Sequence, residues 1–359
     1  MKANKPFLAE PIHRSLFDGV AIPALPLALT SGRRFDERRQ RALMRYYMDS
    51  GSGGVAVGVH STQFEIRDPE IGLYEPVLSL AAEEMQAYEA NVGRPLIKVA
   101  GVVGETDQAV KEAELAANLG YDIALVSLSA FKEGTNEQMI EHLNAVSDVM
   151  PIFGFYLQPS VGGRRLDYDF WRAAVKIENL VAIKTAPFNR YDTLDVLRAV
   201  ADGNRQDSLA MYTGNDDNIM LDLLTPVRFS EDENAPVIRF RGGLLGQWAV
   251  WTRQAVKDLE MIKEVRDAGG NIPLSLLTRA QQLTDANAAI FDAANGFAGC
   301  IPGIHEILRR QGLLEGLWTL NPNEVLSPGQ SEALDRVCQA YPSLNDDTFV
   351  KENLDRWLR

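Results

Sequence analysis

The chain has 359 residues, and 46% of them are hydrophobic, which is enough to bury the core of one large domain or two smaller ones. Its 36 basic and 49 acidic residues give a formal net charge of -13, and Lys and Arg form no continuous basic stripe. This charge balance argues against nucleic acid and against anionic membrane surfaces as partners.

Cysteine content and the N-terminal segment bear on the cellular compartment. Cys300 and Cys338 are the two cysteines, too few and too isolated for a disulfide framework or a thiolate metal site. Residues 1–19 lack the apolar core of a signal peptide, and no stretch approaches the ~20 consecutive apolar residues that cross a bilayer. We therefore expect a cytoplasmic protein without a membrane partner.

Short apolar segments recur along the chain and are predicted to be β-strands. From the third to the seventh, their starts lie 27 to 29 residues apart, which suits repeated βα units joined by right-handed crossovers. The predicted strands lie within residues 20–29, 53–59, 95–103, 122–128, 151–157, 180–185, 208–214 and 236–246.

The segments between these strands are predicted to be amphipathic helices. Residues 35–51 and 105–120, for example, space their apolar side chains for one helix face, carry acidic residues near the start and end on glycine. Eight such units predict a (β/α)8 TIM barrel. The competing layout, a doubly wound open sheet, would usually show a glycine-rich phosphate loop after its first strand, and none is present.

The strand rhythm ends near residue 250. We therefore predict a barrel domain over residues 1–250, which holds the catalytic site, and a C-terminal helical extension over residues 251–359 that packs on it. The acidic, proline-bounded segment 225–239 is predicted to be a surface loop or hairpin inserted before the eighth strand.

Two polar side chains stand at the ends of neighbouring strands, where a barrel places its active site. Tyr156 in "FYLQPS" and Lys184 in "VAIKTA" are 28 residues apart, one βα repeat, so we expect them at similar height. Apolar neighbours favour the neutral amine of Lys184, the form that attacks a carbonyl carbon to make a Schiff base, and a phenol beside it could carry protons. A salt-bridged lysine and a packed tyrosine are the alternatives.

Other strand ends offer groups for substrate binding. In "GVHSTQFE", the hydroxyls of Ser61 and Thr62 and the backbone N–H groups suit a carboxylate, unless they cap a helix. His60 is a candidate proton carrier or substrate donor, or else a buried structural histidine. Gly214 in "TGNDD" is expected near the barrel mouth, where Asp216 or Asp217 would cap the next helix, and Gly243 in "RGGLLGQWAVW" could bring backbone close to a ligand.

In this order and at these spacings, the motifs resemble the dihydrodipicolinate synthase and N-acetylneuraminate lyase family of class I aldolases. The resemblance runs from about residue 18 into the C-terminal helices and rests on "FYLQPS", "VAIKTA", "GVVGET" and "TGNDD". It implies that Lys184 forms an imine with pyruvate or another 2-oxo acid and that Tyr156 assists proton transfer. It also implies an aldehyde as second substrate, no dissociable cofactor, and a homotetramer or homodimer.

The sequence also departs from that family. The family's threonine pair matches either Ser61-Thr62 or His60-Ser61, and "SLSAFKEG" has Phe131 but no tyrosine for the synthases' shared proton relay. Val161 stands where a synthase holds the arginine that grips its second substrate, although Arg164 and Arg165 follow nearby. We therefore expect a Schiff-base aldolase, lyase or dehydratase that is not a dihydrodipicolinate synthase.

Two other functions compete with this interpretation. A non-catalytic barrel could bind a sugar acid or similar metabolite and regulate a partner, but it would have no need of a neutral Lys184 beside Tyr156. A metal-dependent hydrolase would need clustered His and Asp ligands, and no metal-binding His spacing is found in the sequence.

Overall fold

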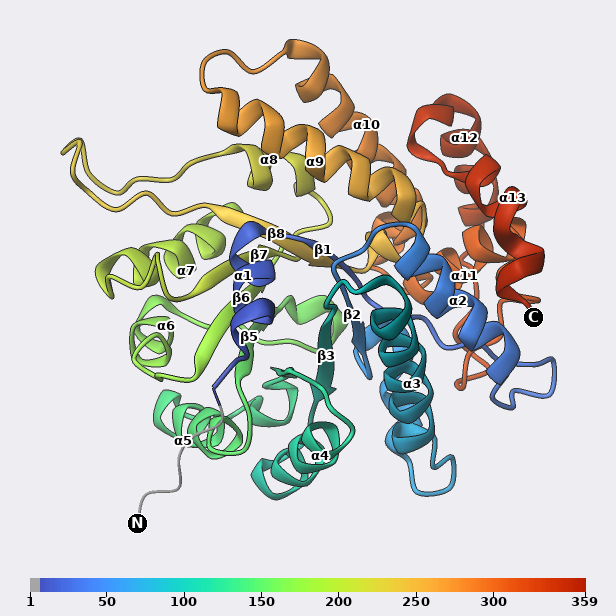
Figure 1. The fold of residues 1–359 in the computed structure, drawn as a ribbon, viewed down its shortest axis with the longest axis horizontal. Coiled ribbons are helices and arrows are strands. Elements are labelled where there is room, and N and C mark those ends of the chain that lie inside the picture. The colour runs from blue at the N-terminus through green and yellow to red at the C-terminus, as the bar shows by residue number, and fades with distance from the viewer. Residues whose placement is uncertain (1–6) are drawn as a thin grey trace.

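Eight parallel strands form one sheet in the order β1-β8-β7-β6-β5-β4-β3-β2 (Figure 1), and a bridge between Ala24 and Ala56 brings its two edges together. This computed structural model describes residues 7–359 and confirms the predicted TIM barrel with C-terminal helices. Each strand begins within a predicted segment. The strands are β1 (Ala21–Pro23), β2 (Gly54–Val57), β3 (Ile97–Val102), β4 (Ile123–Val126), β5 (Ile152–Leu157), β6 (Leu180–Ala186), β7 (Ala210–Thr213) and β8 (Phe240–Leu245).

Helices follow the strands and cover the outside of the barrel. Several begin at a polar residue that caps the free backbone N–H groups: Asp36 accepts from the Arg39 N–H, and Asn189 accepts from two backbone N–H groups of the next turn. The covering helices are α2 (Glu37–Asp49), α3 (Tyr74–Val92), α4 (Thr106–Asn118), α5 (Asn136–Ser147), α6 (Tyr168–Ala174), α7 (Arg190–Asp202), α8 (Ile219–Leu224) and α9 (Thr252–Ala268).

One end of the barrel is closed by α1 (Glu10–Asp18), which lies across it in Figure 1. Ile12 and Leu16 of this helix join the cluster of side chains that fills the barrel interior. The Tyr212 hydroxyl donates to the Leu16 carbonyl at 2.9 Å and so fixes the helix to β7. A Cβ on Gly19 would lie 2.0 Å from the carbonyl of Arg241 at the start of β8, so the closed end is the N-terminal end of the strands.

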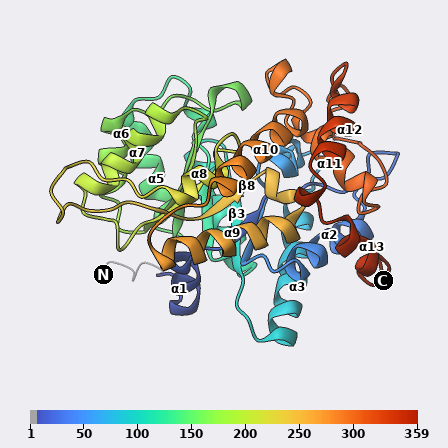
Figure 2. The ribbon, with the colours of Figure 1, turned by 90° about the horizontal axis from the view of Figure 1, so that it is seen from above.

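The C-terminal helices gather on one side of the barrel (Figure 2). They are α10 (Leu274–Ile290), α11 (Cys300–Arg310), α12 (Gln330–Ala340) and α13 (Asp347–Trp357). The helix α9 precedes them and packs on α8 and β1, so it completes the outer ring of the barrel although it lies beyond residue 250. The predicted boundary at that residue therefore separates β8 from its own helix, and the division into two domains stays a prediction.

The segment 225–239 leaves the barrel as an extended excursion before β8 (Figure 1). Val227 and Ile238 exchange two backbone hydrogen bonds of 2.9 and 2.8 Å, so the segment has the predicted hairpin form. Its tip is exposed.

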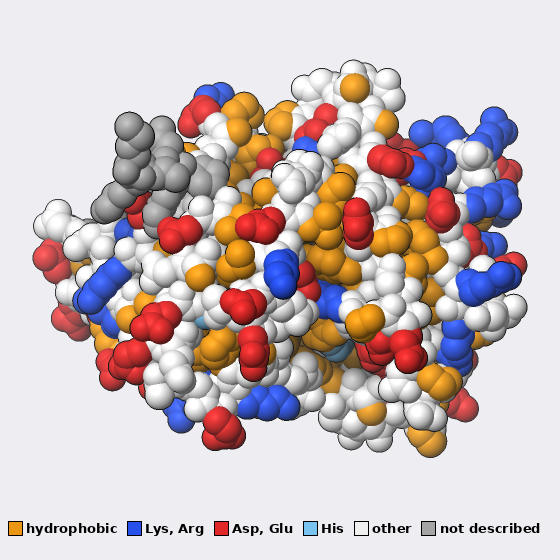
Figure 3. Space-filling model, turned by 90° about the horizontal axis from the view of Figure 1, so that it is seen from below, with side chains coloured by type: hydrophobic (Ala, Val, Ile, Leu, Met, Phe, Trp, Pro, Cys, Tyr) orange, Lys and Arg blue, Asp and Glu red, His pale blue; other side chains and the backbone are white. Residues whose placement is uncertain are grey.

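The surface carries charges of both signs. Figure 3 shows acidic and basic side chains interspersed on one face, with hydrophobic side chains between them. Within residues 7–359, no helix combines the length and the apolar character needed to cross a bilayer. The first six residues, which belong to the predicted barrel domain and to the segment in which we expect no signal peptide, lie outside the described residues.

Candidate active site

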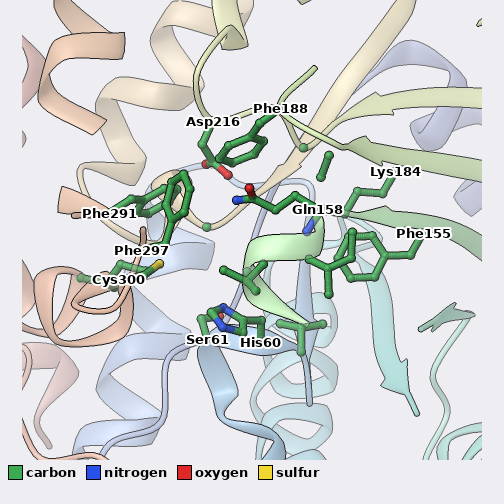
Figure 4. Close-up of a pocket in the computed structure, with 18 residues that line it drawn as sticks. His60, Ser61, Phe155, Gln158, Lys184, Phe188, Asp216, Phe291, Phe297 and Cys300 are labelled. Carbon is green, nitrogen blue, oxygen red and sulfur yellow. The ribbon is translucent and has the colours of Figure 1, made fainter. Parts of the chain in front are cut away.

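A pocket with about 610 Å³ of empty space, part of it open to solvent, lies at the C-terminal ends of the strands. Its floor comes from β5 and β6 and from the loops after β1, β2, β7 and β8, and one wall comes from the chain around the start of α11 (Figure 4). This is the end of the barrel opposite α1, where the sequence predicts the active site.

Lys184 reaches this pocket from β6. Its side chain is 8% exposed, and its Nζ lies 4.4 Å from the centroid of the Phe155 ring. Burial lowers the pKa of the amine below its ordinary value, whereas the nearby Asp216 carboxylate acts in the opposite direction. Lys184 is therefore placed as predicted, with an environment that favours the nucleophilic neutral amine.

Asp216 is the carboxylate of the site, and it lies in the loop after β7. Its Oδ1 accepts a hydrogen bond of 2.9 Å from the Gln247 N–H, and its carbonyl accepts one of 2.6 Å from Asn287 Nδ2. Burial raises the pKa of this carboxyl group, and Lys184 opposes the rise. The pKa values of Lys184 and Asp216 are thus closer to each other than those of free lysine and aspartate, so transfer of a proton between the two groups costs little free energy.

The sequence-based interpretation of Asp216 as a helix cap is wrong. The residue at the N-cap of α8 is Asn218, and no side chain caps that end. The sequence feature that could have indicated a role at the active site is the position of this carboxylate in "TGNDD", three residues after the end of β7.

Tyr156 lies at nearly the same height as Lys184 on the neighbouring strand, as predicted, but its side chain is on the other face of the sheet, so the expectation of a phenol beside the amine is wrong. The register of β5 against β6 shifts after Ile152, which pairs with Leu180, whereas Phe153 pairs with Ala182. This bulge leaves Val181 as an extra residue. A slip of one residue turns a strand position to the opposite face of the sheet.

The consequence is that Phe155, and not Tyr156, stands beside Lys184 on the inner face. Tyr156 is 1% exposed and belongs to the outer core between the sheet and the helices. Its hydroxyl accepts a hydrogen bond of 3.2 Å from the Leu166 N–H, its ring lies 5.8 Å from that of Trp171, and burial raises its pKa to about 12.

The loop after β2 contributes His60 and Ser61 to the pocket, but not Thr62. The Thr62 hydroxyl is turned into the loop, where it accepts from two backbone N–H groups at 3.1 and 3.2 Å and donates to the Leu25 carbonyl at 2.7 Å. It therefore shapes the loop. Ser61 Oγ lines the pocket and donates to the same carbonyl at 3.3 Å. Burial lowers the pKa of His60 to about 4, with a contribution from the charge of Lys184.

Gly214 lines the pocket, as predicted, and Gly243 does not. A Cβ on Gly214 would lie 2.7 Å from the Cε of Lys184, so the glycine makes room for the lysine chain. The Cβ of a residue at position 243 would instead meet the ring of Trp248, which is buried beside a separate cavity. Gly246, the residue directly after β8, lines the pocket instead.

Val161 lines the pocket, and the two arginines that follow it do not. Arg164 donates to the carbonyl oxygens of Phe131 and Gly134, the latter at 2.8 Å. Arg165 is exposed, with its Nε 3.5 Å from the Asp192 carboxylate. Neither guanidinium replaces the arginine that the sequence lacks at position 161.

Three phenylalanines form a wall that sequence reasoning missed: Phe188 after β6, Phe291 at the end of α10, and Phe297 before α11. We call these three residues the aromatic wall. Figure 4 shows them gathered opposite Lys184 and Phe155. Cys300 and Ile304 of α11 continue the same side. No group of three or more His, Cys, Asp or Glu side chains in residues 7–359 has the geometry of a metal site.

Known proteins resemble this chain in sequence and in fold. Residues 19–226 match the model of the "Dihydrodipicolinate synthetase family". Two curated relatives are 4-hydroxy-tetrahydrodipicolinate synthases. The one from Alkaliphilus oremlandii is 29% identical over 117 residues (32% of this chain, 38% of the relative), and that from Acaryochloris marina is 30% identical over 113 residues (31% and 37%). The chain thus covers less than two fifths of the length of either relative.

Solved structures extend the likeness over most of the chain at the level of the fold. A prophage protein of the dihydrodipicolinic acid synthase family from E. coli K12, in complex with pyruvate, has a TM-score of 0.72 at 16% identity, covering 90% of this chain and 99% of that chain. N-acetylneuraminate lyase from Fusobacterium nucleatum has a TM-score of 0.68 at 14% identity, with the same coverage.

Proposed function

The chain belongs to the dihydrodipicolinate synthetase family, and from this premise we propose that it is a Schiff-base aldolase or lyase that acts on a 2-oxo acid. The observation that carries the proposal is the buried Lys184 at the C-terminal end of β6, which lines a pocket at the mouth of the barrel and whose pKa is lowered by burial. A related protein of known structure was solved in complex with pyruvate, which makes pyruvate the first substrate to test.

The chemistry follows from the neutral amine. Lys184 Nζ attacks the C2 carbonyl carbon of the 2-oxo acid, and loss of water gives an imine. The protonated imine withdraws electrons from the bond between C3 and its substituent. That bond breaks to leave an enamine, or, in the reverse direction, the enamine carbon attacks an aldehyde. In the cleavage direction the enamine then takes a proton at C3 to become an imine, and in both directions hydrolysis of the imine frees Lys184.

Proton transfer at this site is assigned to Asp216, because the Tyr156 hydroxyl lies on the other face of β5. The Asp216 carboxyl group has a raised pKa, so it can hold a proton near neutral pH and release it to a substrate oxygen. His60 is neutral at the same pH, because its pKa is lowered to about 4, and it can donate or accept a hydrogen bond.

The carboxylate of the 2-oxo acid is assigned to the loop after β2. Ser61 lines the pocket there, where its hydroxyl would exchange its 3.3 Å bond to the Leu25 carbonyl for one to the carboxylate, and backbone N–H groups of such a loop suit an anion. Thr62 supports this role indirectly, because the hydrogen bonds of its hydroxyl group hold the loop after β2 against Leu25.

The second substrate is proposed to differ from aspartate semialdehyde, the aldehyde of the synthases. A carboxylate on the second substrate would need a cation, and Arg164 and Arg165 are directed elsewhere. Val161 offers an apolar surface in their place. We therefore expect negligible condensation of pyruvate with aspartate semialdehyde.

Reductive trapping tests the proposal. Incubation with pyruvate and borohydride should add the mass of the reduced adduct to Lys184, and Lys184→Ala should abolish the addition. Lys98 is an internal control, because it is a second buried strand lysine but is held 2.7 Å from Glu89 and lies outside the pocket. Trapping at another lysine, or at none across a panel of 2-oxo acids, would overturn the Schiff-base function.

A further inference from the structure

The pocket has two sides of different chemistry. Lys184, Asp216, His60 and Ser61 bring the polar groups, and the aromatic wall with Val161 and Ile304 forms the apolar side. In Figure 4 the amide of Gln158 points towards Asp216, so Gln158 adds a further polar group on the side of Asp216. The reacting end of a substrate therefore belongs near Lys184, and its far end belongs against the aromatic wall.

Two rings of the aromatic wall pack against each other. Phe188 and Phe297 stand edge to face, with ring centroids 5.6 Å apart and an interplanar angle of 74°. Both residues have positive φ angles, 52° and 71°, which non-glycine residues rarely adopt, so their surroundings hold them in place. The Phe188 N–H, for example, donates to Asn215 Oδ1 at 3.1 Å. Fixed edge-to-face rings favour a flat aromatic group over a flexible chain.

The charged residues of the pocket further restrict which second substrates can bind. Among the eighteen residues that line the pocket, Lys184 is the one Lys or Arg, and imine formation would engage it. An acceptor with a carboxylate or phosphate at its far end would bury a charge without a partner, which is costly. An open-chain polyol would leave most of its hydroxyls unpaired against the aromatic wall for the same reason.

We propose that the aromatic wall binds the ring of an aryl aldehyde, an inference that rests on the proposed Schiff-base function. Asp216 takes a proton from C3 of the imine that pyruvate forms with Lys184, and the resulting enamine attacks the aldehyde carbon and forms a C–C bond. A proton from Asp216 goes to the aldehyde oxygen. Water then hydrolyses the imine, which releases a 4-aryl-4-hydroxy-2-oxo acid and frees Lys184. The cleavage direction reverses these steps.

The experiment compares aldehydes with pyruvate held constant. The wild-type protein is assayed with benzaldehyde, butanal and aspartate semialdehyde, and the new C–C product is measured by mass spectrometry. We expect kcat/KM for benzaldehyde to exceed that for butanal by about 10-fold or more, because the flat ring contacts fixed phenyl edges. We expect it to exceed that for aspartate semialdehyde by about 100-fold or more.

Variants connect the preference to the aromatic wall. Phe297→Ala should raise KM for benzaldehyde about 10-fold or more, whereas Tyr191→Ala, which removes an exposed aromatic ring of α7 that does not line the pocket, should leave it unchanged. If Phe297→Ala fails to fold, Phe297→Leu keeps an apolar side chain and should still reduce the preference for benzaldehyde over butanal.

The trapping assay separates the two ways in which the inference could fail. A wild-type protein that is trapped by pyruvate at Lys184 but converts benzaldehyde no faster than butanal overturns the aryl-aldehyde inference and leaves the Schiff-base function standing. An equal loss of both aldehyde activities in Phe297→Leu would also overturn it. A protein that is not trapped by any 2-oxo acid overturns the Schiff-base function itself.

Discussion

The pKa of Lys184 is set by two opposed effects, burial and the charge of Asp216. Asp216→Asn removes the negative charge that favours the ammonium form, so the pKa of Lys184 should fall further. Because the neutral amine is the nucleophile, the rate of adduct formation rises with pH through that pKa, and its inflexion should move from about 8 to a lower pH. The measurement is the pyruvate adduct trapped by cyanoborohydride, followed by intact mass across a pH series. An inflexion that stays or moves upward would contradict this account.

In contrast to Asp216, Tyr156 is expected to contribute little to turnover. Tyr156→Phe removes one hydrogen bond to the Leu166 N–H and should cost about 1 kcal/mol in the free energy of unfolding. Turnover should stay within about threefold of wild type, whereas Asp216→Asn should slow it by about 10²–10⁴, the usual effect of losing a positioned acid or base. Steady-state rates beside urea unfolding curves give both numbers. A Tyr156→Phe rate as low as that of Asp216→Asn would restore the tyrosine as proton carrier.

At this scale, the sequence identifies Lys184 more securely than its partners. A lysine at the end of an apolar strand is a local signal, and the structure places it as expected. The partner of that lysine depends on register, and a bulge at Val181 leaves no mark in a count of residues between motifs. The sequence shows that an aspartate follows β7, but it does not show that Asp216 is buried, because its partners Gln247 and Asn287 are distant in the chain.

Among the elements, the contact of α10 with α11 positions the aromatic wall. A Cβ on Gly303 of α11 would lie 1.9 Å from the carbonyl of Ile290 at the end of α10, so Gly303→Ala must push the two helices apart. We expect a loss of about 1–3 kcal/mol in the free energy of unfolding and a higher KM for benzaldehyde, because Phe291 and Phe297 flank this contact. Gly32→Ala is the matched control, since the nearest atoms to its Cβ lie 3.9 Å away. Equal stability of the two variants would show that the helices yield without cost.

The strands and helices of the barrel could be predicted from the sequence better than the residues of the pocket. Strands and helices of a barrel repeat at a regular spacing, and that spacing is present in the sequence whatever the tertiary contacts are. The aromatic wall could not be found in this way. Phe188 follows a barrel strand, and Phe291 and Phe297 come from the C-terminal helical region, so only the fold brings them to one pocket.

For the whole molecule, Asp346 ties the barrel to the C-terminal helices. Its Oδ2 accepts from the Tyr46 hydroxyl of α2 at 2.8 Å and from the Arg253 N–H of α9 at 2.9 Å, and Oδ1 accepts from Gln311 at 2.8 Å. Asp346→Ala removes the acceptor of the Tyr46 hydroxyl and of the Arg253 N–H and should cost about 2–4 kcal/mol in the free energy of unfolding.

Thermal and urea unfolding of the full chain test this connection. We expect barrel and C-terminal helices to unfold in one transition in the wild type, and Asp346→Ala to lower its midpoint. Asp347→Ala is the control, because that carboxylate accepts from Gln311 at the surface and should cost less than about 0.5 kcal/mol. Two separate transitions in the wild type would instead support independent domains divided near residue 250.

The extra residue at Val181 has a consequence for how such chains diverge. A substitution changes one side chain, whereas the gain or loss of one residue low in β5 or β6 exchanges which of two adjacent side chains the strand presents to the amine. In this chain the register presents the phenyl ring of Phe155 to the amine and not the phenol of the adjacent Tyr156. Retention of a tyrosine in an alignment is therefore no proof that its hydroxyl was kept for catalysis. Chemistry in this barrel can be lost, or regained, by an insertion or deletion that leaves the motif intact.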